Sequence, residues 1–256
     1  MLDRLIAGAA QDAWQRRAVR PIAEVEAAAT ARTPALDALE ALRPADRVKV
    51  IAEIKRASPS RGPLAGIPDP AALAVSYQTG GASAISVLTD RRNFRGSLAD
   101  LEAVRDAVAV PVLRKDFITQ PYQVLEARAA GADIVLLIVA ALDQPTLSSL
   151  HELVNELGMT ALVETHSADE ISRALDVGGA LIGVNARDLN TFELDQNLFG
   201  SLADRIPSGV IRVAESAVKA PADVAHYRAA GADVVLIGEA LVSGDPVLTL
   251  TGFLAA

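Results

Sequence analysis

Short apolar segments alternate along the chain with longer helical ones from Val48 onward. Eight apolar runs predict buried strands: VKVIAEI (48–54), SAISVLT (83–89), VPVLRK (110–115), DIVLLIV (133–139), TALVET (160–165), ALIGVN (180–185), GVIRVAES (209–216) and DVVLIG (233–238). Ala- and Leu-rich stretches between them predict helices near residues 69–79, 98–108, 120–130, 144–157, 168–177, 197–204, 221–230 and 245–254. Near-continuous apolar runs that alternate with helices are typical of a parallel sheet covered on both faces.

Eight such units predict an α/β fold that closes as a (β/α)₈ TIM barrel. A doubly wound open sheet is the alternative, but no GxGxxG follows the first predicted strand. Glycine is expected to end the helix in four similar turns that lead into strands: GGAS (80–83), AGAD (130–133), GGAL (178–181) and AGAD (230–233). Several loops that leave the strands are longer, at 56–68, 89–97 and 186–196. In this fold such loops surround the active site.

The first 47 residues have a different pattern. They are Ala-rich and charged, and Pro21, Pro34 and Pro44 interrupt them, which predicts two or three helices and no strand. We therefore expect a helical N-terminal extension, residues 1–47, packed on a catalytic barrel domain of residues 48–256. The N-terminus lacks the apolar region of a signal peptide, and no uncharged apolar stretch is long enough to span a membrane. A cytoplasmic location without membrane association is expected.

The net charge and the cysteine and histidine content limit which ligands and which catalytic groups are expected. The net charge of −8 argues against nucleic-acid binding, although a positive cleft could still take a small anionic substrate. The chain has no cysteine, which excludes disulfides, a thiolate nucleophile and a cysteine metal site. His151, His166 and His226 lack the spacing of metal ligands and are predicted to be surface or helix residues. No metal and no cofactor is expected.

Polar side chains end the predicted strands. Because side chains alternate along a strand, Glu53 and Lys55 in the run IAEIK point the same way and reach the barrel mouth. The other strand ends add Arg114, Lys115, Asp116, Glu164, Asn185, Glu215, Ser216, Gly238 and Glu239. Lysines and glutamates crowded in a dry pocket are expected to have shifted pKa values, which suits proton transfer near neutral pH.

Two readings of this polar rim are open. It could be a structural ion-pair network, in which glutamates balance Lys55, Lys115 and Arg187. Because the polar groups gather at one end of the strands, a ligand site is favoured over that network. The loops after the seventh and eighth strands often bind phosphate in barrels. Ser216-Ala217 and Gly238-Glu239 occupy those places, and Glu239 would repel a phosphate unless it points away.

These residues resemble a known family, the indole-3-glycerol phosphate synthases of tryptophan biosynthesis. The resemblance covers essentially the whole chain and rests on six motifs: IAEIKRASPS (51–60), Phe94-Arg95-Gly96-Ser97, VLRKDF (112–117), LVETH (162–166), GVNARDL (183–189) and VAES (213–216). It implies a carboxy-lyase that acts without a cofactor on 1-(2-carboxyphenylamino)-1-deoxyribulose 5-phosphate. The ring carbon bearing the carboxylate attacks the ketone, CO₂ leaves, then water leaves, and indole-3-glycerol phosphate results.

The resemblance also implies residue roles. Lys115 would be the general acid, and Glu164, with Glu53 as the second candidate, the base. Lys55 would hold the substrate carboxylate or assist dehydration. Asn185 and Glu215 would fix hydroxyl and carboxylate groups of the substrate, and Arg187 would support the acidic residues. At the phosphate, the resemblance implies Ser216, Ala217 and Gly238 with the adjacent Glu239. Around the anthranilate ring it implies Pro59, Phe94, Phe117, Leu136 and Leu189. Ser58 opens the SPSRGP loop (58–63), which would cover the site.

The chain departs from the family pattern at two positions. Ala217 stands where glycine is usual, which predicts weaker substrate binding, and Arg61 stands where lysine is common. Two alternative functions remain. One is another phosphate-binding barrel of the pathway, phosphoribosylanthranilate isomerase or the tryptophan synthase α subunit. The other is a barrel that binds without catalysis. The partner expected is a small phosphorylated substrate, and the chain is expected to be a monomer, with a weak homodimer as the alternative.

Overall fold

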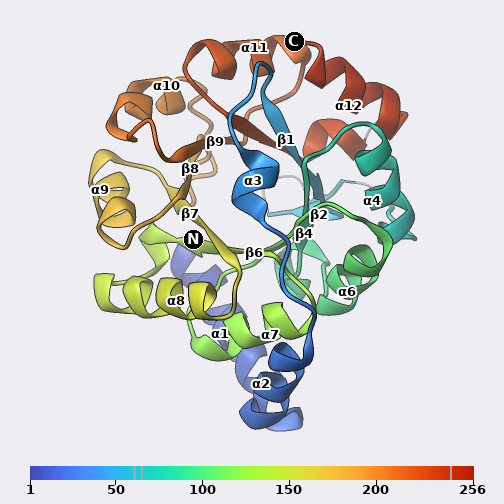
Figure 1. Ribbon diagram of the computed structural model, residues 1–256, viewed down its shortest axis with the longest axis vertical. Coiled ribbons are helices and arrows are strands. Elements are labelled where there is room, and N and C mark those ends of the chain that lie inside the picture. The colour runs from blue at the N-terminus through green and yellow to red at the C-terminus, as the bar shows by residue number, and fades with distance from the viewer. Residues whose placement is uncertain (60–61, 65, 243) are drawn as a thin grey trace.

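A closed barrel of eight parallel strands forms the centre of the computed structural model, which describes residues 1–59, 62–64, 66–242 and 244–256. Around the barrel the strands follow the order β1-β10-β9-β8-β7-β6-β5-β4. Their bounds are β1 (Lys49–Ile54), β4 (Ala84–Leu88), β5 (Val112–Lys115), β6 (Ile134–Ile138), β7 (Thr160–Thr165), β8 (Leu181–Asn185), β9 (Ile211–Glu215) and β10 (Val234–Ile237). Each strand lies within one predicted apolar run, so the predicted (β/α)₈ barrel is confirmed (Figure 1).

Helices surround the barrel at the predicted places. They are α4 (Pro70–Thr79), α6 (Leu98–Ala107), α7 (Pro121–Ala129), α8 (Gln144–Glu156), α9 (Ala168–Asp176), α10 (Leu198–Leu202), α11 (Pro221–Ala229) and α12 (Pro246–Leu254). Asp69, Ser97 and Ser167 each accept a backbone hydrogen bond that caps the following helix. The four predicted helix-to-strand turns hold a glycine at positive φ, namely Gly81, Gly131, Gly178 and Gly231. These helices therefore end where the sequence predicts.

Short elements also occur in the loops, where none was expected. They are the hairpin of β2 (Ala57–Ser58) and β3 (Gly62–Pro63), the single turn α5 (Arg91–Phe94), and the 3₁₀ turns η1 (Val139–Ala141), η2 (Ala203–Arg205) and η3 (Glu239–Val242). Asp90 caps α5 by accepting a hydrogen bond from the Asn93 amide. The β2–β3 hairpin, α5 and η3 follow the carboxyl ends of strands β1, β4 and β10. They therefore add local order around the barrel mouth.

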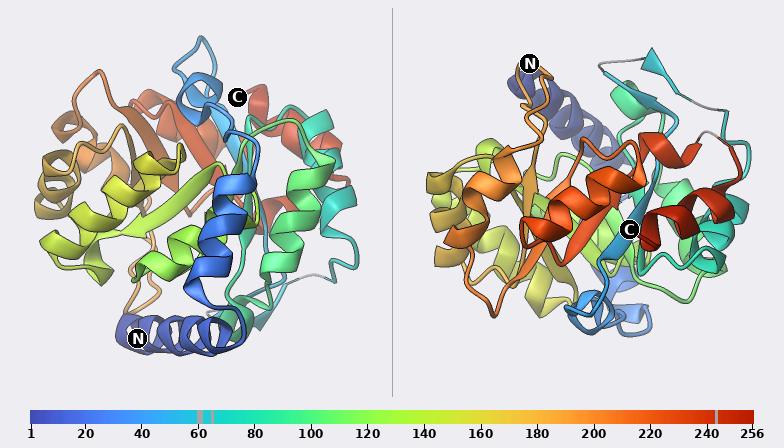
Figure 2. Two further views of the ribbon diagram at one scale, coloured as in Figure 1. Left: turned by 60° about the horizontal axis from the view of Figure 1, so that its bottom comes forward. Right: turned by 90° about the horizontal axis from the view of Figure 1, so that it is seen from above.

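The N-terminal segment forms three helices, α1 (Leu2–Val19), α2 (Ile22–Ala31) and α3 (Ala38–Leu42), as predicted. Figure 2 shows α1 across one end of the barrel and α3 at the opposite end, while α2 packs beside α7. Leu5 of α1 and Leu42 of α3 belong to the apolar cluster inside the barrel. Within the described ranges, none of the helices is long and apolar enough to cross a membrane.

Side chains alternate between the inside of the barrel and the helices outside it. Ile51 joins the inner apolar cluster, whereas its neighbours Val50 and Ala52 join the outer one. The inner apolar layers fill the part of the barrel below the mouth, and the next inward positions along the chain are polar. The barrel thus places a charged layer at the carboxyl ends of its strands.

Candidate active site

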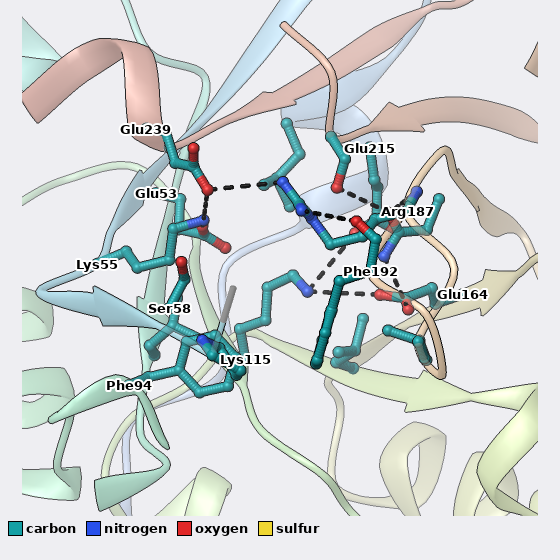
Figure 3. A pocket seen from close by; sticks show the side chains of 18 of the residues that line it. Glu53, Lys55, Ser58, Phe94, Lys115, Glu164, Arg187, Phe192, Glu215 and Glu239 are labelled. Atoms are coloured by element: carbon teal, nitrogen blue, oxygen red, sulfur yellow. Dashed lines mark hydrogen bonds and ion pairs between the residues drawn. The ribbon is translucent and has the colours of Figure 1, made fainter. Parts of the chain in front are cut away.

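A cavity of about 280 Å³ opens at the carboxyl ends of the strands (Figure 3). Every residue to which the family resemblance gave a role in the site lines it: Glu53, Lys55, Ser58, Pro59, Phe94, Lys115, Phe117, Leu136, Glu164, Asn185, Arg187, Leu189, Glu215, Ser216, Ala217, Gly238 and Glu239. Six barrel strands and the loops that follow β1, β4, β5, β8, β9 and β10 contribute these residues. A pocket with convergent charges and an apolar lining is the form that small-molecule sites take.

Lys115 lies at the centre of the charged layer. Its Nζ is 3.4 Å from Glu164 Oε2 and 3.7 Å from Glu215 Oε2, and both glutamates are almost fully buried. Burial alone would lower the pKa of the Lys115 ammonium, but the carboxylates of Glu164, Glu215 and Glu53 outweigh it and raise that pKa. The ammonium is therefore charged and carries protons to donate at neutral pH.

The pKa values of the two glutamates beside Lys115 are shifted in opposite directions. Burial would raise the pKa of Glu164, but Lys115, His166 and a hydrogen bond from Asn185 lower it, so Glu164 is a carboxylate. Burial and the neighbouring Glu164 charge raise the pKa of Glu215 well above its ordinary value. Neither oxygen of Glu215 has a hydrogen-bond partner among the described residues. Titratable groups whose pKa values are pushed apart are typical of acid–base sites.

A second charged group occupies the other side of the mouth. Lys55 Nζ is 2.8 Å from Glu53 Oε1 and 4.0 Å from Glu239 Oε1. The same Glu239 oxygen is 3.6 Å from Arg187 Nη2. Glu239 therefore points toward two cations, as Figure 3 shows, and part of its negative charge is balanced.

Two glycines make room for the buried carboxylates. A Cβ at Gly183 would lie 2.1 Å from Glu215 Oε1, and one at Gly238 would lie 2.5 Å from Glu53 Oε1. Such contacts exclude any side chain at these positions unless the carboxylates move. The sequence analysis linked Gly238 only to phosphate; the contact with Glu53 is a second, independent reason for glycine there.

The loop after β9 has an unusual backbone. Ser216 and Ala217 have φ values of 69° and 58°, in the left-handed region. A left-handed conformation in a residue with a Cβ is disfavoured by roughly 1–2 kcal/mol. Ser216 Oγ donates to Asn185 Oδ1 at 2.8 Å, which ties this loop to β8. Ala217 therefore adopts the conformation for which glycine is the usual residue.

Apolar side chains form one wall of the cavity. The rings of Phe94 and Phe117 lie 6.4 Å apart at an angle of 40°. Leu5 of α1 and Phe192 also line this wall, and the sequence analysis missed both. Phe192 falls in the long loop predicted at 186–196, where the scarcity of aromatic residues was a usable signal. Leu5 carried none, because only the packing of α1 brings it to the mouth.

Two expectations about individual residues were wrong. Arg114, expected at the mouth, faces outward from β5 and is fully buried, where it donates to the Gln123 carbonyl at 2.6 Å and to Asp116 Oδ2 at 2.9 Å. Asp116 does border the cavity, but its carboxylate pairs with Arg114. His166, expected on the surface or a helix, is only 15% exposed, and its Nε2 is 3.5 Å from Glu164 Oε1.

Part of the predicted covering loop lies outside the described residues. Arg61 and the middle of the SPSRGP loop fall outside the described ranges, although Ser58 and Pro59 border the cavity. In the described part of the chain, no three His, Asp or Glu side chains come together as metal ligands would.

Comparison with known proteins identifies the family. A family model described as indole-3-glycerol phosphate synthase matches residues 2–250. The chain is 72% identical to the indole-3-glycerol phosphate synthase of Leifsonia xyli subsp. xyli, over 99% of this chain and 97% of that protein. It is 58% identical to the indole-3-glycerol phosphate synthase of Rhodococcus jostii, over 96% of this chain and 91% of that protein.

Solved structures share the fold at low sequence identity. The N-acetylmannosamine-6-phosphate 2-epimerase from Clostridium perfringens has a TM-score of 0.61 at 14% identity and covers 82% of this chain and 93% of its own. Thiamine phosphate pyrophosphorylase from Pyrococcus furiosus has a TM-score of 0.61 at 13% identity, covering 80% and 93%. These likenesses show the barrel alone. The sequence relatives show more, and the chain belongs to the indole-3-glycerol phosphate synthase family.

Proposed function

We propose that the charged layer at the barrel mouth carries out the reaction of this family, the conversion of 1-(2-carboxyphenylamino)-1-deoxyribulose 5-phosphate to indole-3-glycerol phosphate, CO₂ and water. The family match over residues 2–250 supports the activity. The observation that carries the division of roles is the placement of the Lys115 ammonium between Glu164 and Glu215. An acid and a base thus lie side by side next to an apolar wall.

Ring closure needs a proton donor. The ring carbon that bears the carboxylate forms a bond to the ketone carbon, and the ketone oxygen gains negative charge. Lys115 donates a proton to this oxygen, which becomes a hydroxyl. CO₂ then leaves, and the electron pair of its bond restores the benzene ring. The step is balanced, because the negative charge of the carboxylate is lost with CO₂ and the ketone oxygen keeps one proton from Lys115.

Dehydration needs both an acid and a base. The hydroxyl leaves as water when it receives a proton, for which Lys55 or the reprotonated Lys115 is the donor. A carboxylate takes a proton from the carbon next to the ring nitrogen, and the new double bond completes the indole. Glu164 is the proposed base, because its lowered pKa keeps it ionised. Glu53, paired with Lys55 at 2.8 Å, is the second candidate.

Substrate binding follows the chemical character of the walls. Phe94, Phe117, Leu136, Leu189 and Pro59 surround the anthranilate ring in this proposal. The loop of Ser216 and Ala217, together with Gly238, receives the phosphate. Lys55 and Arg187 attract the two anionic ends of the substrate in this proposal, and Glu239 Oε1 lies 4.0 Å from Lys55 Nζ and 3.6 Å from Arg187 Nη2. We extend the proposal to a cytoplasmic enzyme that acts as a monomer.

A fluorescence assay tests this proposal. The purified chain is mixed with the carboxyphenylamino-deoxyribulose phosphate, and indole fluorescence is followed. Lys115→Ala should reduce turnover by about 10²-fold or more, the contribution of a positioned general acid. Lys49→Ala is the matched control, because Lys49 begins β1 at the opposite end of the barrel. Substrate binding without any turnover by the unaltered chain would instead favour a barrel that only binds.

A further inference from the structure

His166 lies between two carboxylates at the edge of the site. It follows β7, and Ser167 caps α9 directly after it. The His166 backbone N–H donates to Glu170 Oε2 at 2.8 Å, and Nδ1 lies 3.2 Å from the same oxygen. On the other side of the ring, Nε2 lies 3.5 Å from Glu164 Oε1. Glu170 thus fixes the ring so that its second nitrogen faces the proposed base.

This arrangement selects one protonation state. A neutral imidazole carries one N–H, so one of its nitrogens would present a lone pair to a carboxylate. The imidazolium has two N–H groups and satisfies both Glu164 and Glu170. Nε2 is fully buried and has no hydrogen-bond partner within the described part of the chain, so a small shift of Glu164 toward it would satisfy both groups.

We infer that His166 is a positioning residue for Glu164, held as an imidazolium by Glu170 and turned toward Oε1 of the base. Asn185 Nδ2 donates to the same oxygen at 3.1 Å, so Asn185 holds Oε1 from one side and the His166 ring faces it from another. The other oxygen, Oε2, faces Lys115. His166 is not among the residues that line the cavity, so it acts through Glu164 rather than on the substrate. The inference rests on the proposed role of Glu164 as the base.

The surroundings of the ring support a charged histidine. The groups that face it are Glu164 on β7, Glu170 on α9 and Asp188 in the loop after β8. Burial alone would lower the pKa of His166, but these three acidic groups raise it above its ordinary value. Lys115 stays protonated over the same pH range because its own pKa is raised. As pH rises, His166 should therefore lose its proton before Lys115 does.

Nuclear magnetic resonance gives the first test, which does not depend on activity. The chain has three histidines, and the ring resonance lost in His166→Gln identifies His166. Its titration midpoint should lie above 6.5, the ordinary value. Glu170→Gln keeps a hydrogen-bond acceptor but removes the charge, and it should shift the midpoint to lower pH. A midpoint at or below 6.5, or one that Glu170→Gln leaves unmoved, overturns the inference.

The pH dependence of kcat gives the second test. The unaltered chain should lose activity as pH rises through the His166 midpoint, and Glu170→Gln should move this loss to lower pH. His166→Gln should reduce kcat about tenfold below that midpoint, as loss of one charge-assisted hydrogen bond would, and the pH step should vanish. His226→Gln, at an exposed position on α11, should behave as the unaltered chain.

The outcomes separate the inference from the proposed function. If the unaltered chain and His226→Gln turn over while His166→Gln has the same kcat and pH profile, only the positioning role is wrong. If Glu164→Gln retains full turnover, the assignment of the base is wrong, whatever His166 does. If the unaltered chain forms no indole-3-glycerol phosphate, the proposed function fails even when the His166 titration is as expected.

Discussion

Arg114 and Lys115 are consecutive residues of β5, yet they belong to two charged clusters of opposite character. Arg114 faces outward into a buried network with Thr89, Asp116, Glu126 and Arg16, which we call the outer network. Lys115 faces inward to Glu164 and Glu215, which we call the inner cluster. Both clusters bury several charges, and each contains one cation of β5. They differ in how completely those charges are paired.

Most contacts in the outer network are short, although Arg114 Nη2 lies 3.5 Å from Glu126 Oε2. Arg16 binds Glu126 through two contacts of 2.6 and 2.7 Å, and Asp116 Oδ2 accepts from both Thr89 at 2.6 Å and Arg114 at 2.9 Å. In the inner cluster the contacts of Lys115 are 3.4 and 3.7 Å. A buried charge stabilises a fold only when its hydrogen bonds are satisfied. The outer network therefore holds α1 and α7 to the barrel. The ammonium and carboxyl groups of the inner cluster can form further hydrogen bonds with a substrate.

Replacing each cation by methionine should separate the two clusters most strongly. Arg114→Met leaves Asp116 and Glu126 buried without their shared partner, and should lower the free energy of unfolding by about 3–5 kcal/mol. Lys115→Met leaves carboxyl groups that border the cavity and can take up protons, so its effect on stability should stay within ~1 kcal/mol. Urea unfolding at pH 7 measures both. Equal losses would show that the inner cluster is also a structural network.

Replacing one glutamate in each cluster by glutamine should have smaller effects of opposite sign. Glu126→Gln weakens the paired contacts with Arg16 and should cost about 1–3 kcal/mol. The pKa of Glu215 is raised on folding, so the stability it contributes is complete below its unfolded pKa and is lost as pH rises through the folded value. Glu215→Gln removes this loss, and should be more stable than the unaltered chain at neutral pH by ~1 kcal/mol, the scale of one pKa unit.

Thermal unfolding between pH 4 and pH 8 checks the second comparison. The advantage of Glu215→Gln over the unaltered chain should shrink toward pH 4, where the buried carboxyl and the unfolded one are both protonated. An advantage that is constant across this range would contradict the raised pKa. Turnover by Glu215→Gln should fall in either case, because the site loses an ionisable group.

Sequence reasoning predicted the barrel and the composition of its mouth, but not the side to which every charge points. Alternation along β1 placed Glu53 and Lys55 together; the same rule applied to β5 would have turned Arg114 away from Lys115. Other features depend on packing between distant segments and carry no local signal. Leu5 reaches the cavity only because α1 crosses the barrel end, and Glu239 is turned by cations on two other strands' loops.

Room for buried carboxylates is a further feature that the sequence alone did not reveal. Gly183 reads as an ordinary residue of an apolar strand, and only the position of Glu215 on the neighbouring strand explains why a side chain is excluded there. His166 was misjudged for a similar reason. Its spacing from other histidines carried no sign of its actual partners, which are glutamates on β7 and α9.

The backbone also differs between the helix-to-strand turns and the barrel mouth, in which residues adopt positive φ. At the helix-to-strand turns, the described positions with positive φ are glycines, such as Gly131 and Gly231, whereas the mouth holds Ser216 and Ala217 at positive φ. Ala217→Gly should relieve about 1 kcal/mol of strain in the loop proposed to bind phosphate, and should lower KM by about fivefold. Glycine at position 217 also gives the unbound loop more conformational freedom, which raises KM. The direction of the change in KM therefore shows which of the two effects is larger. Steady-state kinetics with Gly209→Ala, a substitution in open space at the far end of the barrel, provide the measurement and its control. An unchanged or higher KM would mean that the left-handed Ala217 is held without loss of affinity.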